Sequence, residues 1–99
     1  MPYIPQEERP QYAEGIKLLV DALKNTARKN LYLLPGHVNY IISSIVLHAW
    51  KDSTEQQGAK FGYTERSEMV SVLENAKLEM YRRHVGPYED GAIERNGDI

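Results

Sequence analysis

Residues 67–90 read SEMVSVLENAKLEMYRRHVGPYED, and this stretch has the strongest helical periodicity in the chain. Apolar side chains recur in it at spacings of three and four, which places them on one face of a helix. This main row consists of Met69, Leu73, Ala76 and Met80, with Val72 beside it. A second, sparser row on the opposite side consists of Leu78, Tyr81 and Val85. Because amphipathic helices hide each apolar face, we expect either that both rows lie in one small bundle or that the second row contacts a partner copy.

The ends of this helix carry recognisable signals. Thr64 offers an N-cap side chain, and Glu65 and Glu68 suit the positive end of the helix dipole. Gly86 followed by Pro87 predicts that the helix stops near residue 85, since glycine suits a left-handed cap and proline cannot continue a helix. Residues 86–99 are then predicted to form a charged tail.

Two further helices are predicted upstream. The row in residues 37–51 consists of Val38, Ile42, Ile45 and Ala49, widened by Ile41 and Val46. Its β-branched residues also suit a strand, but the row persists over three turns and favours a helix. Tyr40, Leu47 and Trp50 fall outside the row, so this helix is expected to be covered on more than one side, the second side by another subunit. In residues 11–27 the row consists of Ile16, Leu19, Val20, Leu23 and Ala27.

The remaining segments are predicted to be irregular. Residues 1–10 contain three prolines and form an arm, in which Tyr3 and Ile4 either fray with the terminus or dock on a neighbour. Pro35 and Gly36 are expected to end whatever residues 31–34 form, and residues 52–62 are expected to be a loop. The sequence therefore predicts an all-α fold, a small bundle of about three main helices in a single domain over residues 1–99.

Composition excludes several classes of function. The chain has 99 residues, of which 41% are hydrophobic and 26% charged, with a net charge of −2 and no cysteine. It lacks the basic excess typical of nucleic-acid binding, so no nucleic-acid partner is predicted. Without cysteine there is no thiol nucleophile, disulfide framework or thiolate zinc site. We see no signal peptide and no membrane-spanning segment, so we expect a cytoplasmic protein without a membrane partner. A chain this short is also near the lower size limit for a self-sufficient core, which favours a homo-oligomer.

One cluster has the chemistry of a binding site. Arg82 and Arg83 are adjacent and point in different directions on a helix, so one can pair with Glu79 while the other contacts a ligand. Guanidinium groups bind phosphate bidentately and stack on aromatic rings. The predicted ligand-binding residues are Lys77, Arg82 and Arg83 for phosphate, Tyr40, Tyr81 and Tyr88 for stacking, and Asn39, Glu89 and Asp90 for hydroxyl or base edges. The alternative is a solvated ladder of charges on an exposed helix face.

Catalytic and metal-binding motifs are weak. The three histidines, His37, His48 and His84, do not have the spacing of a helical zinc pair. Glu65-x-x-Glu68 matches one of two acidic patterns with which the all-α nucleotide pyrophosphatases bind magnesium, but the second helix offers no acidic partner before residue 52. We therefore predict no catalytic residue, no metal and no cofactor, with a magnesium-dependent pyrophosphatase as a weaker alternative.

Several segments together resemble a family of small, functionally uncharacterised proteins of bacteriophages and bacteria. The resemblance is carried by MPYIPQEER at the start, the HVNYII segment at residues 37–42, LENAKLEMYRRHVGPYED, and IERNGDI at the end. Asn75 stands where the family usually has cysteine, so a cysteine-based function is not expected. Residues 11–34 and 52–62 are not covered specifically.

This resemblance implies a phage setting but no activity. Small phage proteins often act by binding host machinery, and one such class is the oligomeric sponge that sequesters cyclic nucleotides or cyclic ADP-ribose immune signals. The setting and the arginine–tyrosine chemistry lead us to expect a non-enzymatic, anti-defence protein that sequesters a small phosphorylated ligand. The alternative is a protein-binding inhibitor of a host enzyme.

Overall fold

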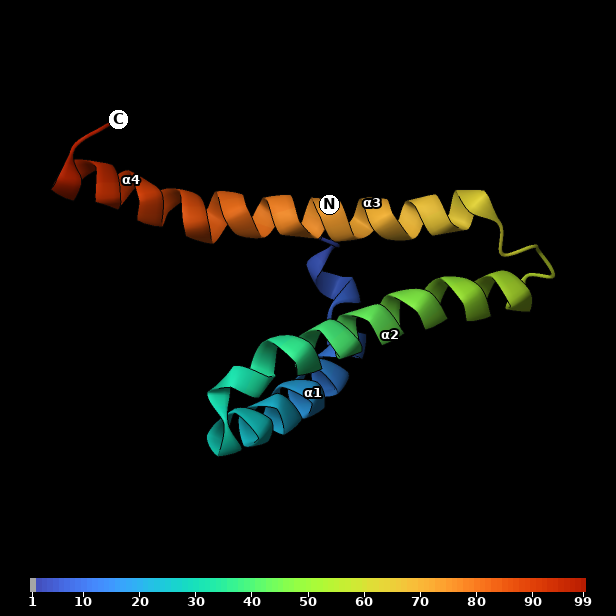
Figure 1. Cartoon of the computed structure of the whole chain (residues 1–99). Coiled ribbons are helices and arrows are strands. Elements are labelled where there is room, and N and C mark those ends of the chain that lie inside the picture. Colours follow the sequence, from blue (N-terminus) through green and yellow to red (C-terminus); the bar gives the residue numbers. More distant parts are fainter. Residues whose placement is uncertain (1) are drawn as a thin grey trace.

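The computed structural model describes residues 2–99, and their secondary structure is entirely helical (Figure 1). Short 3-10 turns at Gln6–Glu8 and Leu31–Leu33 precede helices α1 (Pro10–Lys29) and α2 (Leu34–Gln56). Helix α3 (Tyr63–Met80) is joined by a π-turn, Tyr81–Val85, to helix α4 (Gly86–Asn96). No strand occurs among residues 2–99, and the prediction of an all-α fold with three main helices is confirmed.

Pro35 begins a helix instead of ending one. The sequence predicted that Pro35 and Gly36 would terminate residues 31–34, and this was wrong. The side chain of Asn30 accepts a hydrogen bond from the Tyr32 amide at 3.0 Å and turns the chain after α1. Pro35 then lies in the first turn of α2. Backbone N–H groups in a first turn have no acceptor within the helix, so the N–H that proline lacks is not needed there.

The loop between α2 and α3 is shorter than predicted. Helix α2 continues to Gln56, so the predicted loop at residues 52–62 is reduced to residues 57–62. Thr64 is not the N-cap, because α3 begins at Tyr63 and the N-cap is Gly62. The Glu65 carboxylate accepts a hydrogen bond from the Gly62 N–H at 3.0 Å. Trp50 Nε1 donates to Glu68 Oε2 at 2.9 Å and ties the two helices together beside the loop.

The predicted stop after residue 85 was also wrong. Gly86 has φ −54° and ψ −54°, which is right-handed helical geometry and not a left-handed cap. In a regular α-helix the ring of Pro87 would clash with the carbonyl group of residue 83. The wider π-turn accommodates that ring without breaking the helix, so the predicted charged tail is helical as far as Asn96.

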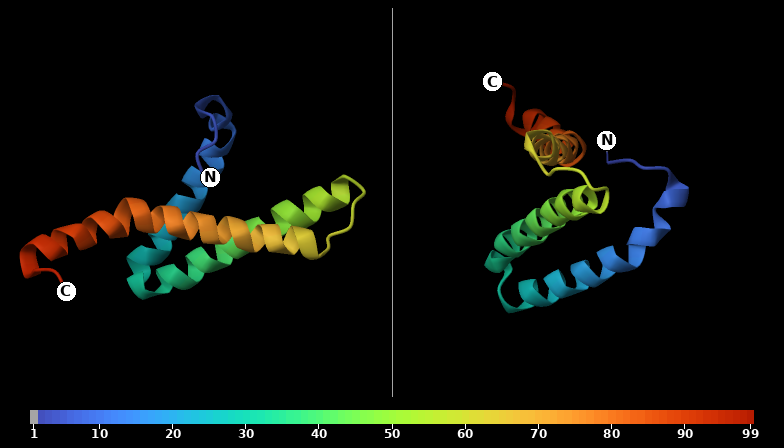
Figure 2. Two further views of the ribbon diagram at one scale, coloured as in Figure 1. Left: turned by 90° about the horizontal axis from the view of Figure 1, so that it is seen from above. Right: turned by 90° about the vertical axis from the view of Figure 1, so that its right-hand side faces the viewer.

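The three main helices touch only near the turns that connect them. Helix α1 packs on the first part of α2, and α2 packs on α3 beside the loop, but α1 and α3 do not contact each other. Figure 2 shows the resulting open frame, in which the N-terminal arm crosses from α1 to α3. The radius of gyration is 17.4 Å, against about 13 Å for a compact chain of this length.

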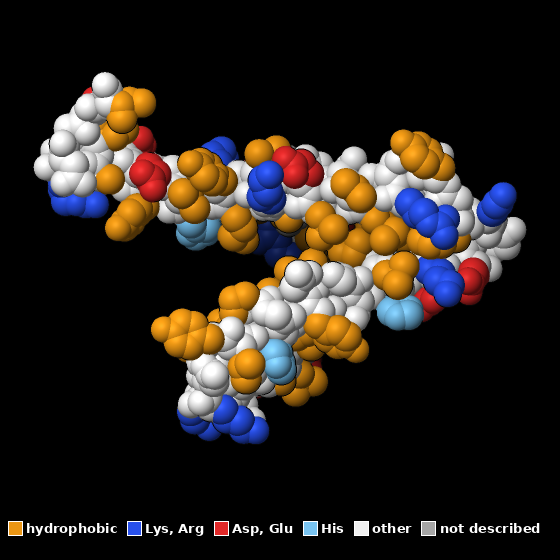
Figure 3. Space-filling model, in the orientation of Figure 1, with side chains coloured by type: hydrophobic (Ala, Val, Ile, Leu, Met, Phe, Trp, Pro, Cys, Tyr) orange, Lys and Arg blue, Asp and Glu red, His pale blue; other side chains and the backbone are white. Residues whose placement is uncertain are grey.

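This open arrangement leaves residues 2–99 without a buried core. The predicted rows of α2 and α3 do face each other, but they diverge and enclose a groove of about 510 Å³. Figure 3 shows hydrophobic side chains along both walls of this V-shaped space. We call it the α2–α3 groove; it is lined by Ile42, Ile45, Val46, Val72, Leu73, Ala76, Lys77 and Met80.

Candidate anion-binding cluster

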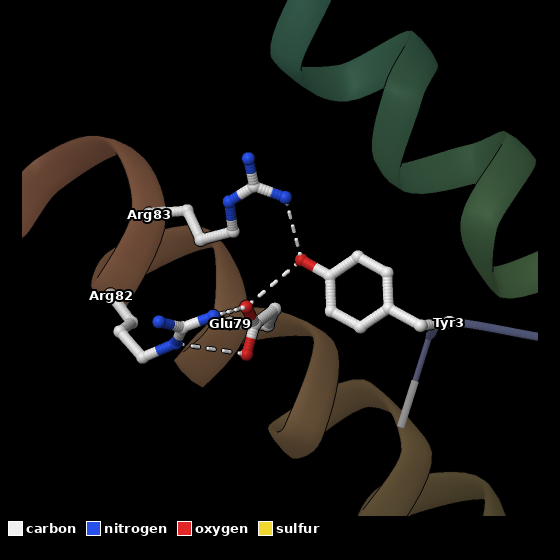
Figure 4. Close-up of polar contacts among 4 residues, drawn as sticks. All are labelled: Tyr3, Glu79, Arg82 and Arg83. Carbon is white, nitrogen blue, oxygen red and sulfur yellow. Dashed lines mark hydrogen bonds and ion pairs between the residues drawn. The ribbon is translucent and has the colours of Figure 1, made fainter.

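A polar cluster forms where the N-terminal arm meets the end of α3. Glu79 lies in the last turn of α3, and Arg82 and Arg83 follow in the π-turn. Tyr3 reaches them from the arm (Figure 4). The sequence left open whether Tyr3 frays or docks, and in the structure it docks on α3 of its own chain.

Hydrogen bonds connect these four side chains in a row. The Tyr3 hydroxyl donates to Glu79 Oε1 at 2.9 Å, and Arg83 Nη1 donates to the Tyr3 oxygen at 2.9 Å. Arg82 binds the same carboxylate through two nitrogens, Nε to Oε2 at 3.3 Å and Nη2 to Oε1. Arg82 therefore pairs with Glu79, as predicted for one of the two arginines, and Arg83 bonds to Tyr3. The contact of the second arginine with a ligand stays a prediction.

The cluster has an electrostatic signature that follows from these bonds. The hydrogen bond from Arg82 and then the one from Tyr3 lower the pKa of Glu79 below its ordinary value, because both stabilise the carboxylate. The bond to Glu79 raises the pKa of Arg82, and the bond to Tyr3 raises the pKa of Arg83. Glu79 is thus a neutralised anion, and one arginine charge remains in excess.

Arg83 is the side chain best placed to receive an anion. A guanidinium group has five N–H donors, and Arg83 uses one of them within residues 2–99. Its guanidinium carbon lies 5.9 Å from the centroid of the Tyr3 ring. A concavity of about 230 Å³ adjoins the cluster, lined by Pro2, Tyr3, Ala76, Glu79, Met80, Arg83 and His84. That volume is smaller than the roughly 300–1,000 Å³ of sites for whole drug-sized ligands.

The structure does not gather all nine predicted ligand-binding residues in one place. Lys77 lines the α2–α3 groove and pairs with Glu74 at 3.3 Å. Asn39 accepts a hydrogen bond from Ser43 on α2, where Tyr40 is also exposed.

The other predicted stacking and edge residues lie around and beyond the π-turn. Tyr81 is exposed within that turn, and Tyr88 is exposed on α4, where the guanidinium carbon of Arg95 lies 5.7 Å from its ring centroid. Glu89 and Asp90 are exposed on the same helix. Only Arg82 and Arg83 therefore belong to the cluster within one chain.

Sequence reasoning missed Tyr3 as a member of the site, and it paired Glu79 with an arginine without counting Glu79 among the site residues. Tyr3 lies 76 residues from Glu79 and 80 from Arg83, so no local spacing connects them. The usable signal was the aromatic residue in the proline-rich arm, for which docking had been one of two alternatives.

The carboxylates of the Glu65-x-x-Glu68 pattern are engaged elsewhere. Glu65 accepts a hydrogen bond from the Gly62 N–H, and Glu68 accepts one from the Trp50 indole N–H. No group of three histidine or acidic side chains within residues 2–99 is arranged to hold a metal ion. None of the described helices has both the length and the apolar character needed to cross a membrane.

These features define a class: a small, open, all-α chain in which a polar cluster joins an N-terminal arm to an arginine pair. The chain belongs to the family described as Domain of unknown function (DUF6899), which matches residues 1–99. Comparison with curated proteins finds no match, and neither does comparison with solved structures.

Proposed function

We propose that this chain is a non-enzymatic accessory protein of phage type that binds and sequesters a small phosphorylated ligand, such as a cyclic-nucleotide or ADP-ribose signal used in antiviral defence. The observation that carries the proposal is the position of Arg83. The Tyr3 hydroxyl holds its guanidinium beside the neutralised Glu79–Arg82 pair, with further N–H donors unpaired within residues 2–99. A guanidinium held in advance loses less conformational entropy on binding an anion.

The residues have distinct roles in this proposal. Arg83 binds the phosphate, and Tyr3 positions the Arg83 guanidinium. Arg82 neutralises Glu79, whose free carboxylate would otherwise repel an anion. The concavity beside them accepts the phosphate group, and the exposed tyrosines Tyr40, Tyr81 and Tyr88 supply stacking surfaces for the remainder of a nucleotide.

Calorimetric titration and thermal shift test the proposal. The probes are inorganic phosphate, cyclic nucleotides and ADP-ribose derivatives, each with the purified full chain. For a probe that binds, Arg83→Ala should weaken affinity roughly tenfold or more, because it removes a charge-assisted hydrogen bond. Arg83→Lys should recover part of the loss, since it keeps the charge but not the planar fork.

The matched control is Arg28→Ala in the last turn of α1, which removes an arginine outside the cluster. It should change affinity by less than about twofold, as expected for an exposed charge remote from the ligand. Absence of heat and of any thermal shift across the whole panel would refute the proposal. Equal losses with Arg28→Ala and Arg83→Ala would refute the assigned site.

A second candidate is a protein-binding inhibitor of a host enzyme. The observation that favours it is the second apolar row of α3 and the π-turn, where Leu78, Tyr81 and Val85 are exposed. A stoichiometric protein retained from host lysate, and lost with Leu78→Lys, would support this candidate; a co-purifying small molecule would support sequestration.

The magnesium-dependent pyrophosphatase has the weakest support of the three, because both carboxylates of its motif already bind partners in the chain. It predicts magnesium-dependent turnover that Glu65→Gln and Glu68→Gln abolish. A panel of nucleotides assayed with magnesium decides this, and no turnover rejects the hydrolase.

A further inference from the structure

The α2–α3 groove, of about 510 Å³, is lined almost entirely by apolar side chains. Its walls carry apolar side chains of which Ile42, Ile45 and Met80 are each more than 40% exposed. Exposed apolar patches much larger than a few hundred Å² are uncommon on monomeric proteins and mark interaction surfaces.

The unfilled surface continues beyond this groove. A second apolar concavity, of about 250 Å³, lies between α1 and α2 and is lined by Val20, Leu23, Lys24, Ala27, Leu34 and Val38. Further along the same face of α1, Ile16 and Leu19 are exposed. Both concavities open between helices that converge at one end only, as the frame in Figure 2 shows. Within residues 2–99 neither α3 nor α4 contacts α1, and α4 does not contact α2, so these helices leave both concavities open.

The amount of exposed surface matches what an obligate assembly buries. The chain exposes 8529 Å², whereas a compact monomer of 11.4 kDa exposes about 5,800 Å². The excess is about 2,700 Å² per chain, and obligate homodimers bury about 2,000–5,000 Å² or more in total over two chains. One dimer interface, or two interfaces in a larger ring, accounts for this excess.

We infer that a second copy of this chain fills the α2–α3 groove and that the folded unit is a homo-oligomer. The occupant is a second copy and not a foreign partner because residues 2–99 have no buried residue of their own. A chain that cannot bury apolar surface alone needs its partner in order to fold. Another copy is the one partner present in equal amount whenever the chain is made.

The exposed apolar rows of α2 and α3 then lie on the interface between copies. Net charge per chain is only −2, so copies repel one another weakly. This assignment does not depend on the proposed ligand, and a chain that binds no phosphate still requires it.

The first test is the mass of the purified chain alone. Light scattering and native mass spectrometry should give an integral multiple, two or more, of 11.4 kDa at micromolar concentration. A monodisperse species of 11.4 kDa that is fully helical would overturn the inference and favour a foreign occupant. Use of the chain by itself separates this result from any failure of ligand binding.

The second test does not require a disruptive variant. The chain has no cysteine, so Ile45→Cys places a unique thiol in the groove and Lys51→Cys places one on the opposite side of α2. In an isolated chain Ile45 is 53% exposed, and its replacement thiol would be alkylated about as fast as the control. In the oligomer the groove thiol should react at least tenfold more slowly, and denaturant should abolish that protection. Equal native rates for the two thiols would overturn the inference.

Discussion

Replacement of Ile45 by alanine distinguishes an isolated chain from an assembled one by the size of its effect on stability. Ile45 projects into the α2–α3 groove from the middle of α2. In the single chain 53% of its surface remains in solvent. The free energy lost on truncation therefore depends on whether a second copy covers the other half.

The two cases differ by more than experimental error. Loss of three carbon groups costs roughly 2.4 kcal/mol for a fully buried side chain, from about 0.8 kcal/mol per CH₂. Half exposure reduces this to about 1.2 kcal/mol, and the better helix propensity of alanine recovers about 0.4 kcal/mol. An isolated chain should thus lose roughly 1 kcal/mol. If a second copy fills the groove, the truncation leaves a cavity at the interface, and the loss rises to about 2–5 kcal/mol.

Urea unfolding followed by circular dichroism measures this difference at one fixed protomer concentration. We expect a loss above about 2 kcal/mol for Ile45→Ala, together with an unfolding midpoint that rises with protein concentration. The control is Val70→Ala on α3, because Val70 lies outside the groove and is 67% exposed. That control should remain within about 0.5 kcal/mol of the parent.

A loss of no more than about 1 kcal/mol for Ile45→Ala, together with a midpoint that does not depend on concentration, would refute the filled groove. Both observations together describe a chain whose groove stays in solvent. A concentration-dependent midpoint with a small loss would keep the oligomer but remove Ile45 from its interface.

Three further predictions concern the end of α3 and α4. Because the pKa of Glu79 is lowered in the folded chain, its carboxylate stabilises the fold above the unfolded pKa, and this stabilisation is lost as the pH falls through the folded pKa. In a carboxyl-carbon NMR titration, Arg82→Gln should raise the pKa of Glu79 more than Tyr3→Phe does, and an unchanged pKa in both variants would refute the cluster. Pro87→Ala should restore regular α-helix across the π-turn and slow amide exchange there, whereas an unchanged exchange pattern would show that proline is not its cause. Gly97 has φ +88°, a conformation that is unfavourable for alanine. Gly97→Ala should therefore destabilise the last turn of α4 by roughly 1 kcal/mol, and undiminished protection of that turn from amide exchange would contradict this.

The helices themselves were predictable because their signals are local. Rows at spacings of three and four placed α1, α2 and α3 within a few residues, and they identified the two faces that line the α2–α3 groove. The Glu79–Arg82 pair follows from a spacing of three on one helix. The errors at Pro35 and Pro87 arose because the sequence signal for a stop is the same as the signal for a first helical turn. The bounds of the loop and the N-cap of α3 were wrong as well.

The candidate site was only half predictable. The sequence singled out the arginine pair by composition, but it grouped Asn39, Tyr40 and Tyr88 with that pair, and within one chain the structure leaves them apart. Helix periodicity specifies which side chains share a face, and it carries no information on the angle at which two helices diverge. That angle decides which faces meet.

The sequence by itself determined the helical class, the amphipathic rows, the arginine pair and the absence of thiol chemistry, because each depends on residue type or on spacings within a few turns. Only the tertiary structure decided that α3 and α4 continue through a π-turn and that Tyr3 crosses to Glu79 and Arg83. It also decided that the helices diverge and that residues 2–99 enclose no buried core. The physical reason is that these outcomes depend on backbone sterics at one proline and on contacts between segments up to 80 residues apart.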